Sequence, residues 1–256
     1  MYARGVRRLL VSSLAACGRL GFSGRVGSDA APPDAAVLDA ALPAGLIHHW
    51  QLDEAPGATV AIDAVAGANA TVMPPATFVT NGQRGGALYS AAGGFASVPA
   101  TPSDMLGRAQ LTVSGWFRRA GPSMIEQIGQ ELTPGHDTIS LQLWSDGLTY
   151  FCMGSPGACG TTAVTNDSNW HFVAMVFDGT QPTDATKLVG YIDGIAYTLS
   201  WQYTLPVATS SPTLSGRFDL GATTDNEGDD TGTVDDVRVY DRALDAVEIM
   251  TLFVST

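Results

Sequence analysis

Over most of its length, the chain consists of short apolar segments separated by Gly, Asp, Asn and Pro. Apolar and polar residues alternate over residues 111–117 and 139–144, a pattern typical of strands with one buried face. Residues 170–177 are apolar on both faces, which predicts a central strand covered on both sides. In residues 191–196, Asp-Gly stands between apolar residues, the strongest short-range signal for a β-hairpin. These patterns predict an all-β sandwich.

One helix is predicted near the end of the chain. Asp245 can cap its first turn, and Glu248 follows at the spacing of a capping box. The apolar stripe of this helix comprises Val247, Ile249, Met250 and Leu252. We expect a short helix packed on the sandwich.

Three regions are predicted along the sequence. Residues 1–16 have the layout of a secretory signal peptide. Residues 17–45, rich in Ala, Pro and Asp, have the composition of a flexible tether. Residues 46–256 contain the predicted strands and form one domain. No repeat of fixed period occurs, which disfavours a solenoid or propeller.

The N-terminal region carries the most specific local signal. Three arginines precede a short apolar segment, and Leu14-Ala15-Ala16-Cys17 resembles the lipobox of bacterial lipoproteins, in which the cysteine is acylated. Such an anchor would fasten the protein to a membrane. Gly18 after the cysteine favours the outer membrane or cell surface of a Gram-negative bacterium. The alternative is an ordinary signal peptide that leaves Cys17 as a free thiol.

Charge narrows the range of partners. The formal net charge is -12, and without residues 1–16 it is -15, with 10 basic and 25 acidic side chains. Nucleic acid is therefore excluded as a partner. An acidic surface suits divalent cations such as calcium, which prefer oxygen ligands.

Several motifs, in order, resemble bacterial laminin-G-like domains of the concanavalin A-like superfamily. The matching segments are 50–54 (WQLDE), 85–88 (GGAL), 111–117 (LTVSGWF), 170–179, 191–194 and 234–244. The resemblance covers about residues 46–253. It implies two antiparallel sheets in a jelly-roll sandwich, and a carbohydrate-binding or adhesive module. Fold alone does not fix the ligand.

A glycan-cleaving enzyme is the catalytic alternative, because β-glucanases share this sandwich. Those enzymes carry carboxylates at alternating positions of one strand. The glutamates here do not follow that pattern: Glu126 and Glu131 are an odd number of residues apart, with Gly129 between them. We therefore expect no catalysis of this kind, although paired aspartates could support inverting chemistry.

Nucleophilic and zinc chemistry are disfavoured as well. There is no Gly-x-Ser-x-Gly motif. His48 and His49 are adjacent and would point to opposite faces of a strand. His171 lies in a segment that should be buried, and His136 in a predicted loop without an evident partner. No zinc site is predicted.

Calcium is the metal that the resemblance implies. In the related β-glucanases, an aspartate in the last strand holds a structural calcium, and Asp235 matches it. An oxygen of the first strand and a glycine carbonyl complete that site, which maps to Asp53 and Gly86. The alternative is that Asp235 and Asp236 are solvated or pair with Arg238. The acidic segment 225–230 lacks the spacing of an EF-hand.

Three tryptophans are candidates for stacking on sugar rings. Trp116 and Trp144 stand on otherwise polar strand faces, and Trp201 lies near two tyrosines. Core packing is the commoner role of tryptophan and remains the alternative for each.

Cys152 and Cys159 are the two cysteines left once Cys17 is acylated. Each lies at the end of a predicted strand, with a turn-rich loop between them. Facing residues of a hairpin are close enough for a disulfide, which an oxidising compartment favours. The alternatives are two reduced thiols, or two cysteine ligands of a metal ion that needs further ligands.

Together these features predict a membrane-tethered, non-catalytic recognition or adhesion module, with a glycan or a cell-surface protein as partner. A purely structural envelope lipoprotein and a divergent glycan-cleaving enzyme are the alternatives.

Overall fold

The computed structural model describes residues 42–91, 93–120, 126–133, 136–144, 146–155, 157–163, 167–202, 205–221 and 231–255, and gives only the backbone for residues 126, 131–133 and 136–137. The chain divides into two units, 1–38 and 39–256, and all described residues belong to the second. The predicted signal peptide, Cys17, segment 225–230 and most of the tether lie outside the described residues. Among the helices described, none has the length and apolar character needed to cross a membrane.

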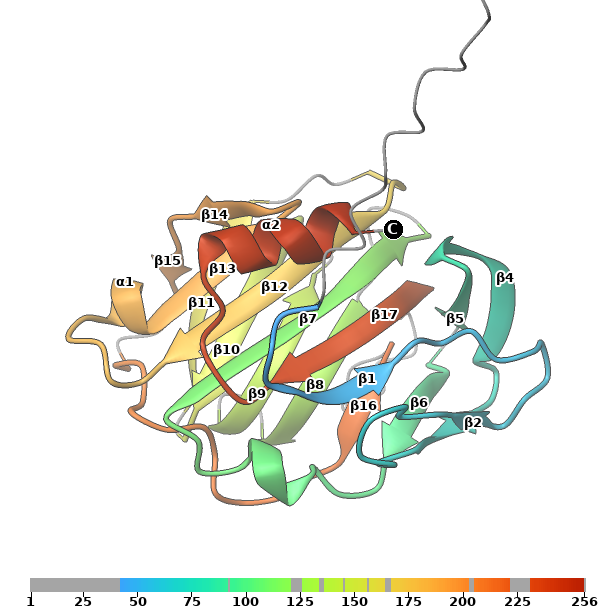
Figure 1. Ribbon diagram of the computed structural model, residues 1–256, viewed down its shortest axis with the longest axis horizontal. Helices are drawn as coiled ribbons and strands as arrows, with labels where there is room; N and C mark the ends of the chain where they lie inside the picture. Colours follow the sequence, from blue (N-terminus) through green and yellow to red (C-terminus); the bar gives the residue numbers. More distant parts are fainter. Residues whose placement is uncertain are drawn as a thin grey trace, which may run out of the picture. The chain divides into compact units, whose positions relative to one another are not determined.

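The described strands form two antiparallel sheets (Figure 1). Sheet A has β14, β13, β12, β7, β17, β5 and β4 in that order, and β1 also pairs with β17. The bounds are β14 (Ile195–Tyr197), β13 (Leu188–Ile192), β12 (His171–Asp178), β7 (Gln110–Arg119), β17 (Gly232–Tyr240), β5 (Gly86–Ser90), β4 (Thr77–Arg84) and β1 (Leu46–Trp50).

Sheet B has β15, β11, β10, β9, β8, β16, β6, β3 and β2 in that order. The bounds are β15 (Ser200–Trp201), β11 (Gly157–Ala163), β10 (Leu148–Gly154), β9 (His136–Leu143), β8 (Glu126–Thr133), β16 (Phe218–Leu220), β6 (Phe95–Val98), β3 (Ala70–Met73) and β2 (Val60–Ala61). The short helices η1 (Ser103–Met105) and α1 (Asp184–Lys187) lie in connections between strands.

The main core lies between the two sheets and follows the alternation in the sequence. In β7, Leu111, Val113 and Phe117 belong to this core, and in β9, Leu141 and its apolar neighbours do. Gly115 of β7 also faces inward: a Cβ there would lie 2.7 Å from Cδ1 of Ile128 in sheet B. A side chain at this position would therefore force the sheets apart.

A second core lies on the outer face of sheet A, beneath α2 (Ala246–Val254), which crosses the strands in Figure 1. The apolar residues of β12 alternate between the cores: Val173 faces the main core and Phe172 faces α2. Asp245 caps α2, accepting hydrogen bonds from the backbone N–H groups of Val247 and Glu248 at 2.9 Å each. Burial of both faces explains why β12 is apolar between His171 and Asp178, the residues at its two ends.

The structure confirms the predicted sandwich, the C-terminal helix and the hairpin between β13 and β14, where Asp193 and Gly194 have positive φ. The predicted helical stripe was partly wrong. Ile249 and Leu252 are buried, but Val247 is 75% exposed and Met250 is 39% exposed. With 3.6 residues per turn, Ile249, Leu252 and Phe253 share the face toward sheet A.

Candidate functional site

A bulge in β17 brings an ion cluster together on the outer face of sheet A. The register against β7 shifts between Asp235 and Arg238, and Asp236 has a φ of 50°. The Asp236 carboxylate contacts Nη1 of Arg84 at 3.1 Å, Nη2 of Arg238 at 3.0 Å and Nε2 of His49 at 2.7 Å. Asp236 is 4% exposed, so this carboxylate is stabilised by ion pairs rather than by water.

Arg84 links the cluster to α2. Its Nη2 donates a 2.5 Å hydrogen bond to the carbonyl oxygen of Leu252, near the C-terminal end of the helix. Its guanidinium also lies 5.6 Å from the ring centroid of Trp116. Burial lowers the pKa of Arg84 from its usual value, opposed by the charge of Asp236. The helix end is therefore held to the sheet by a buried cation.

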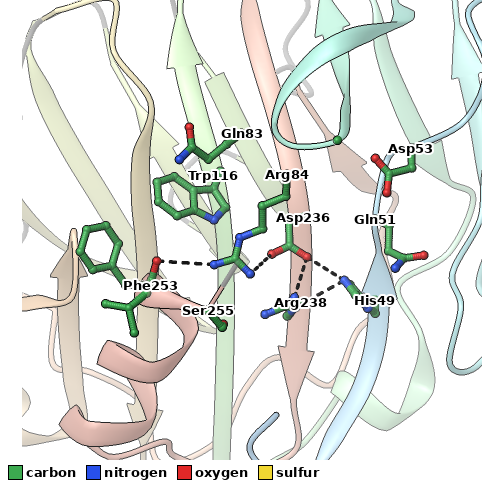
Figure 2. A pocket seen from close by; sticks show the side chains of 12 residues that line it. His49, Gln51, Asp53, Gln83, Arg84, Trp116, Asp236, Arg238, Phe253 and Ser255 are labelled. Carbon is green, nitrogen blue, oxygen red and sulfur yellow. Dashed lines mark hydrogen bonds and ion pairs between the residues drawn. The ribbon is translucent and has the colours of Figure 1, made fainter. Parts of the chain in front are cut away.

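A cavity of about 840 Å³ surrounds this cluster (Figure 2). It lies between β1, the end of β4, β17 and the end of α2. Its lining residues include His49, Gln51, Asp53, Gln83, Arg84, Trp116, Asp236, Arg238, Phe253 and Ser255.

The three predicted calcium ligands border this region. Asp53 Oδ1 accepts a hydrogen bond from the Gly86 backbone N–H at 2.5 Å, and Asp235 Oδ2 accepts one from Arg84 N at 2.7 Å. A Cβ built on Gly82 would lie 1.8 Å from the Gly86 carbonyl oxygen and 2.9 Å from Asp235 Oδ2. The Gly86 carbonyl oxygen and an Asp235 carboxylate oxygen therefore both pack against Gly82.

Asp235 is fully buried, and its Oδ1 has no hydrogen-bond partner among the described residues. The pKa of Asp235 is raised to about 7, chiefly by burial and also by the negative charges of Asp236 and Asp53, against the hydrogen bond from Arg84 N. Within the described part of the chain, no group of three or more His, Cys, Asp or Glu side chains could hold a metal ion. A calcium ion here would thus depend on Asp235 and backbone oxygens, which fit a hard cation.

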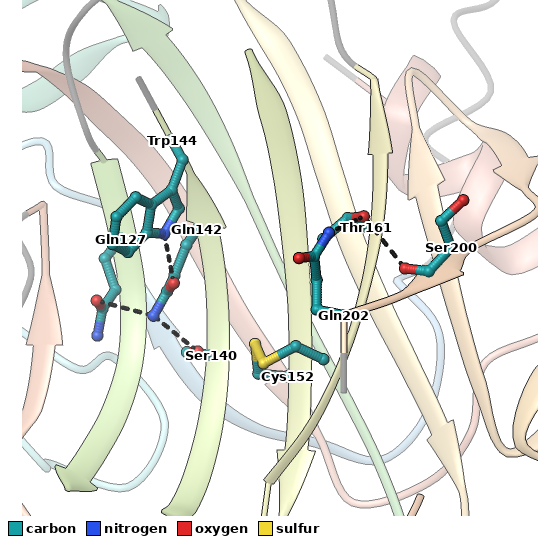
Figure 3. The surroundings of a disulfide bond; sticks show 9 residues. Gln127, Ser140, Gln142, Trp144, Cys152, Thr161, Ser200 and Gln202 are labelled. Carbon is teal, nitrogen blue, oxygen red and sulfur yellow. Dashed lines mark hydrogen bonds between the residues drawn. A yellow bond between two sulfur atoms is a disulfide. The ribbon is translucent and has the colours of Figure 1, made fainter. Parts of the chain in front are cut away.

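A different surface lies on the outer face of sheet B, at the turn between β9 and β10. We call Gln127, Gln142, Trp144, Asp146 and Tyr150 the aromatic–amide patch. The Trp144 and Tyr150 rings lie 5.6 Å apart between centroids. Trp144 Nε1 donates to Gln142 Oε1 at 2.6 Å, and Tyr150 Oη donates to Asp146 Oδ2 at 2.7 Å. Both rings are therefore held by polar neighbours, and Trp144 remains 36% exposed. Figure 3 shows the Trp144 indole beside Gln142 and Gln127.

The three candidate tryptophans lie in different environments. Trp116 is 4% exposed and packs under α2 against Phe172 and Phe253, with centroid distances of 5.5 and 5.7 Å. Trp201 is half-buried and packs against the main core. Trp144 is the candidate that offers an open ring face.

Cys152 and Cys159 form a disulfide beside the aromatic–amide patch (Figure 3). They are directly paired in the β10–β11 hairpin, with 4.2 Å between their Cα atoms. Cys152 pairs with Ser140, which lies two residues before Gln142 in β9. The cysteine side chains therefore lie on the same outer face as Gln142. The bond therefore closes the hairpin that supports the patch.

The histidines are held by carboxylates. His48 Nδ1 contacts Asp63 at 2.8 Å, and His49 contacts Asp236 from the opposite side of β1. His171 is 8% exposed and contacts Asp193 at 2.8 Å, and that hydrogen bond raises the pKa of His171 against the effect of burial. His136 has no described side chain.

Two antiparallel sheets packed face to face, with a helix over one of them, define a jelly-roll sandwich. The profile of the family described as the concanavalin A-like lectin/glucanases superfamily matches residues 92–250. The chain therefore belongs to this superfamily, as its motifs predict. No curated protein sequence matches it.

Solved structures of similar fold include glycan-associated proteins. Domain 4 of AbnA, a GH43 extracellular arabinanase from Geobacillus stearothermophilus in complex with arabinotriose, has a TM-score of 0.60 and 17% identity, over 81% of this chain and 97% of that one. Trypanosoma rangeli sialidase in complex with sialic acid has a TM-score of 0.56 and 19% identity, over 83% of this chain. The botulinum neurotoxin serotype G binding domain has a TM-score of 0.54 and 12% identity, over 75% of this chain.

The chain spans 33% of the sialidase and 47% of the toxin structure, but 97% of the arabinanase domain. At these identities the likeness shows the shared fold. The fold occurs both in glycan-binding domains and within glycosidases, so it does not decide between binding and catalysis.

Sequence reasoning did not identify Arg84 and His49 as parts of a site. They meet Asp236 from strands far away in the sequence, 152 and 187 residues apart from it. The available signal was the Asp235-Asp236 pair inside an apolar strand, because two adjacent acids cannot both face outward without a bulge.

Proposed function

We propose that the protein is a membrane-tethered, non-catalytic recognition module that binds glycans through the aromatic–amide patch. The observation that carries this proposal is the fixed, partly exposed ring of Trp144. An aromatic face can stack on the C–H face of a sugar ring, while neighbouring amide and carboxyl groups bind its hydroxyls.

The polar neighbours favour binding because they reduce the entropy lost on association. Gln142 holds the Trp144 indole through Nε1 and also donates to Gln127 Oε1 at 3.2 Å. Asp146 accepts from both Tyr150 Oη and the Leu148 backbone N–H, at 2.7 and 2.8 Å. The patch is therefore preorganised.

Catalysis has less support from the described residues. The cavity over sheet A holds the carboxylates of Asp53 and Asp236, but Asp236 is occupied by two guanidinium groups. Asp235, whose pKa is raised to about 7, does not line that cavity. Glycoside hydrolysis needs an acid and a second carboxylate that face one cleft. The lining residues described do not include such a pair.

The test is a glycan array followed by titration of the best ligand. Trp144→Ala should weaken binding by about tenfold, equivalent to about 1.4 kcal/mol. Tyr197→Ala is the matched control, because Tyr197 is a 39% exposed aromatic residue on sheet A. An empty array would favour a purely structural envelope protein, and release of cleaved sugar would establish the enzyme alternative.

The tether and anchor are part of the same proposal. Acylation of Cys17 would place the module at a membrane surface, where weak glycan contacts gain from multivalency. Cys17→Ser should abolish acyl labelling and release the protein from the membrane fraction. Unchanged fractionation would contradict the anchor.

We also propose that a structural calcium binds at Asp235, with Gly86 and the first-strand region around Asp53. The support is the buried, unpartnered Asp235 Oδ1 and the Gly86 and Asp235 oxygens that meet at Gly82. A chelator should lower the melting temperature, and Asp235→Asn should remove this sensitivity. Identical melting curves with and without chelator would contradict the calcium site.

A further inference from the structure

The cavity over sheet A contains buried hydrogen-bond donors that no described residue satisfies. Nη1 of Arg238 and Nε1 of Trp116 are both buried and have no partner among the described residues. Both side chains line the cavity, and they are 7% and 4% exposed as whole residues. A buried donor left unpaired costs about 1–3 kcal/mol, so an acceptor in the cavity would stabilise the site.

The rest of Arg238 is already engaged. Its Nη2 pairs with Asp236 Oδ1, and its Nε points to His49 Nε2 at 3.3 Å. His49 Nε2 also contacts Asp236 at 2.7 Å, so this nitrogen cannot both donate to Asp236 and accept from Arg238. Arg238 Nη1 therefore remains a donor that an oxygen atom of a ligand could satisfy.

The fixed charges on the cavity wall are balanced. Arg84 and Arg238 both pair with Asp236, Asp53 supplies a second carboxylate to the lining, and Arg84 also caps the end of α2. The wall therefore gives no strong preference for an anion or a cation, and an uncharged ligand with many oxygens suits it best.

The rim supplies the remaining contacts. Gln51 and Gln83 are both exposed, and their amides can both donate and accept hydrogen bonds. Phe253 and Val254 add an apolar edge to the same cavity. Figure 2 shows Phe253 and Trp116 on one side of the Arg84–Asp236 pair, with His49, Gln51 and Asp53 on the other. An apolar edge beside mixed donors and acceptors matches the surface of a sugar ring.

We propose that this cavity is a second binding site, which takes one or two units of an uncharged saccharide on the sheet opposite the aromatic–amide patch. Its volume of about 840 Å³ lies within the range of small-molecule sites. Oxygen atoms of the sugar accept from Arg238 Nη1 and Trp116 Nε1. This site stands on different residues from the aromatic–amide patch and does not depend on the glycan binding proposed there.

The experiment is an NMR titration of the ¹⁵N-labelled full-length protein with arabinotriose, lactose and maltose, with glucuronate and sialic acid as charged probes. Trp116→Phe identifies the Trp116 indole N–H signal, removes the donor and keeps most of the packing under α2. At least one neutral sugar should shift that signal. Trp116→Phe should weaken the binding about fivefold to tenfold, the equivalent of one hydrogen bond.

Two further variants separate the possible outcomes. Gln83→Ala changes only the rim, so it tests the site even if Trp116→Phe is unstable, and it should also weaken binding. Trp144→Ala should leave the Trp116 shift unchanged, which separates this site from the patch. A Trp116 signal that no neutral sugar moves, or tighter binding of the charged probes, would overturn the proposal.

Discussion

The outer faces of the two sheets begin from the same local pattern and differ in what covers them. In β7, Thr112, Ser114 and Trp116 point outward, and in β9 and its turn, Ser140, Gln142 and Trp144 do the same. Helix α2 covers Trp116 and makes it part of a second core, whereas Trp144 remains 36% exposed. One distant helix therefore decides whether the tryptophan of this pattern is buried in a core or left partly exposed.

The largest expected effect on stability is the difference between alanine variants of these two tryptophans. Trp116→Ala should lower the free energy of unfolding by about 3–5 kcal/mol, because it leaves a cavity between α2 and sheet A. Trp144→Ala should lower it by about 1 kcal/mol or less, because the ring is partly exposed. Denaturant unfolding of both variants measures the difference. Equal losses would show that the two faces do not differ as described.

The disulfide should contribute less to the free energy of unfolding than the second core does, because it closes only a short loop. Cys152→Ser with Cys159→Ser, in a Cys17→Ser background, should cost about 2.5 kcal/mol in the chain-entropy model. Circular dichroism should show that the sandwich remains folded. Two reactive thiols in the denatured, unreduced Cys17→Ser protein would contradict the bridge.

Asp235, on sheet A, should make the free energy of unfolding depend on pH. Its pKa is about 7 when folded against 3.8 for a free carboxyl, so the folded state binds more protons between these values. In chelator, the free energy of unfolding should therefore fall as pH rises from about 4 to about 7, by on the order of 2 kcal/mol. Calcium should reduce this fall by favouring the ionised form.

Asp235→Asn is the control for that measurement, because it cannot ionise and keeps an oxygen to accept from Arg84 N. Its stability should lack the fall that Asp235 causes over the same pH window and should be insensitive to calcium. A wild-type protein with the same pH profile as the variant in chelator would contradict the role assigned to Asp235.

The smallest effect belongs to His171. Its pKa is raised above 6.5, first by the hydrogen bond to Asp193 and then by Asp167. Its contribution to stability is therefore complete below pH 6.5 and is lost as pH rises through the folded pKa. His171→Gln should reduce the decline in stability above pH 6.5, by less than about 1 kcal/mol. Thermal unfolding across this pH range measures it, and an unchanged slope would contradict the effect.

Features encoded locally were predictable from the sequence. The alternation of 111–117 and 139–144, the Asp193-Gly194 turn and the Asp245 cap each depend on residues close together in the chain. The Cys152–Cys159 pairing was predictable for the same reason, because the strands of a hairpin are neighbours.

The site could not be predicted in the same way. The burial of Trp116 depends on Phe253, which follows 137 residues later. Arg84 reaches Asp236 only because of the bulge in β17. Neither the bulge nor the position of α2 follows from the periodicity of a single strand. The sequence therefore shows which chemical groups are present, but not which of them meet in the folded protein.

The position of β17 also fixes the order in which the chain can fold. This strand pairs with β7, β5 and β1, and it joins Trp50 to Val237 across 187 residues. A chain that emerges from a ribosome N-terminus first cannot complete sheet A until β17 has emerged. Pairing over such sequence distances is slow, so the completion of sheet A follows the synthesis of β17. Until then, β1, β5 and β7 each lack the strand that joins them.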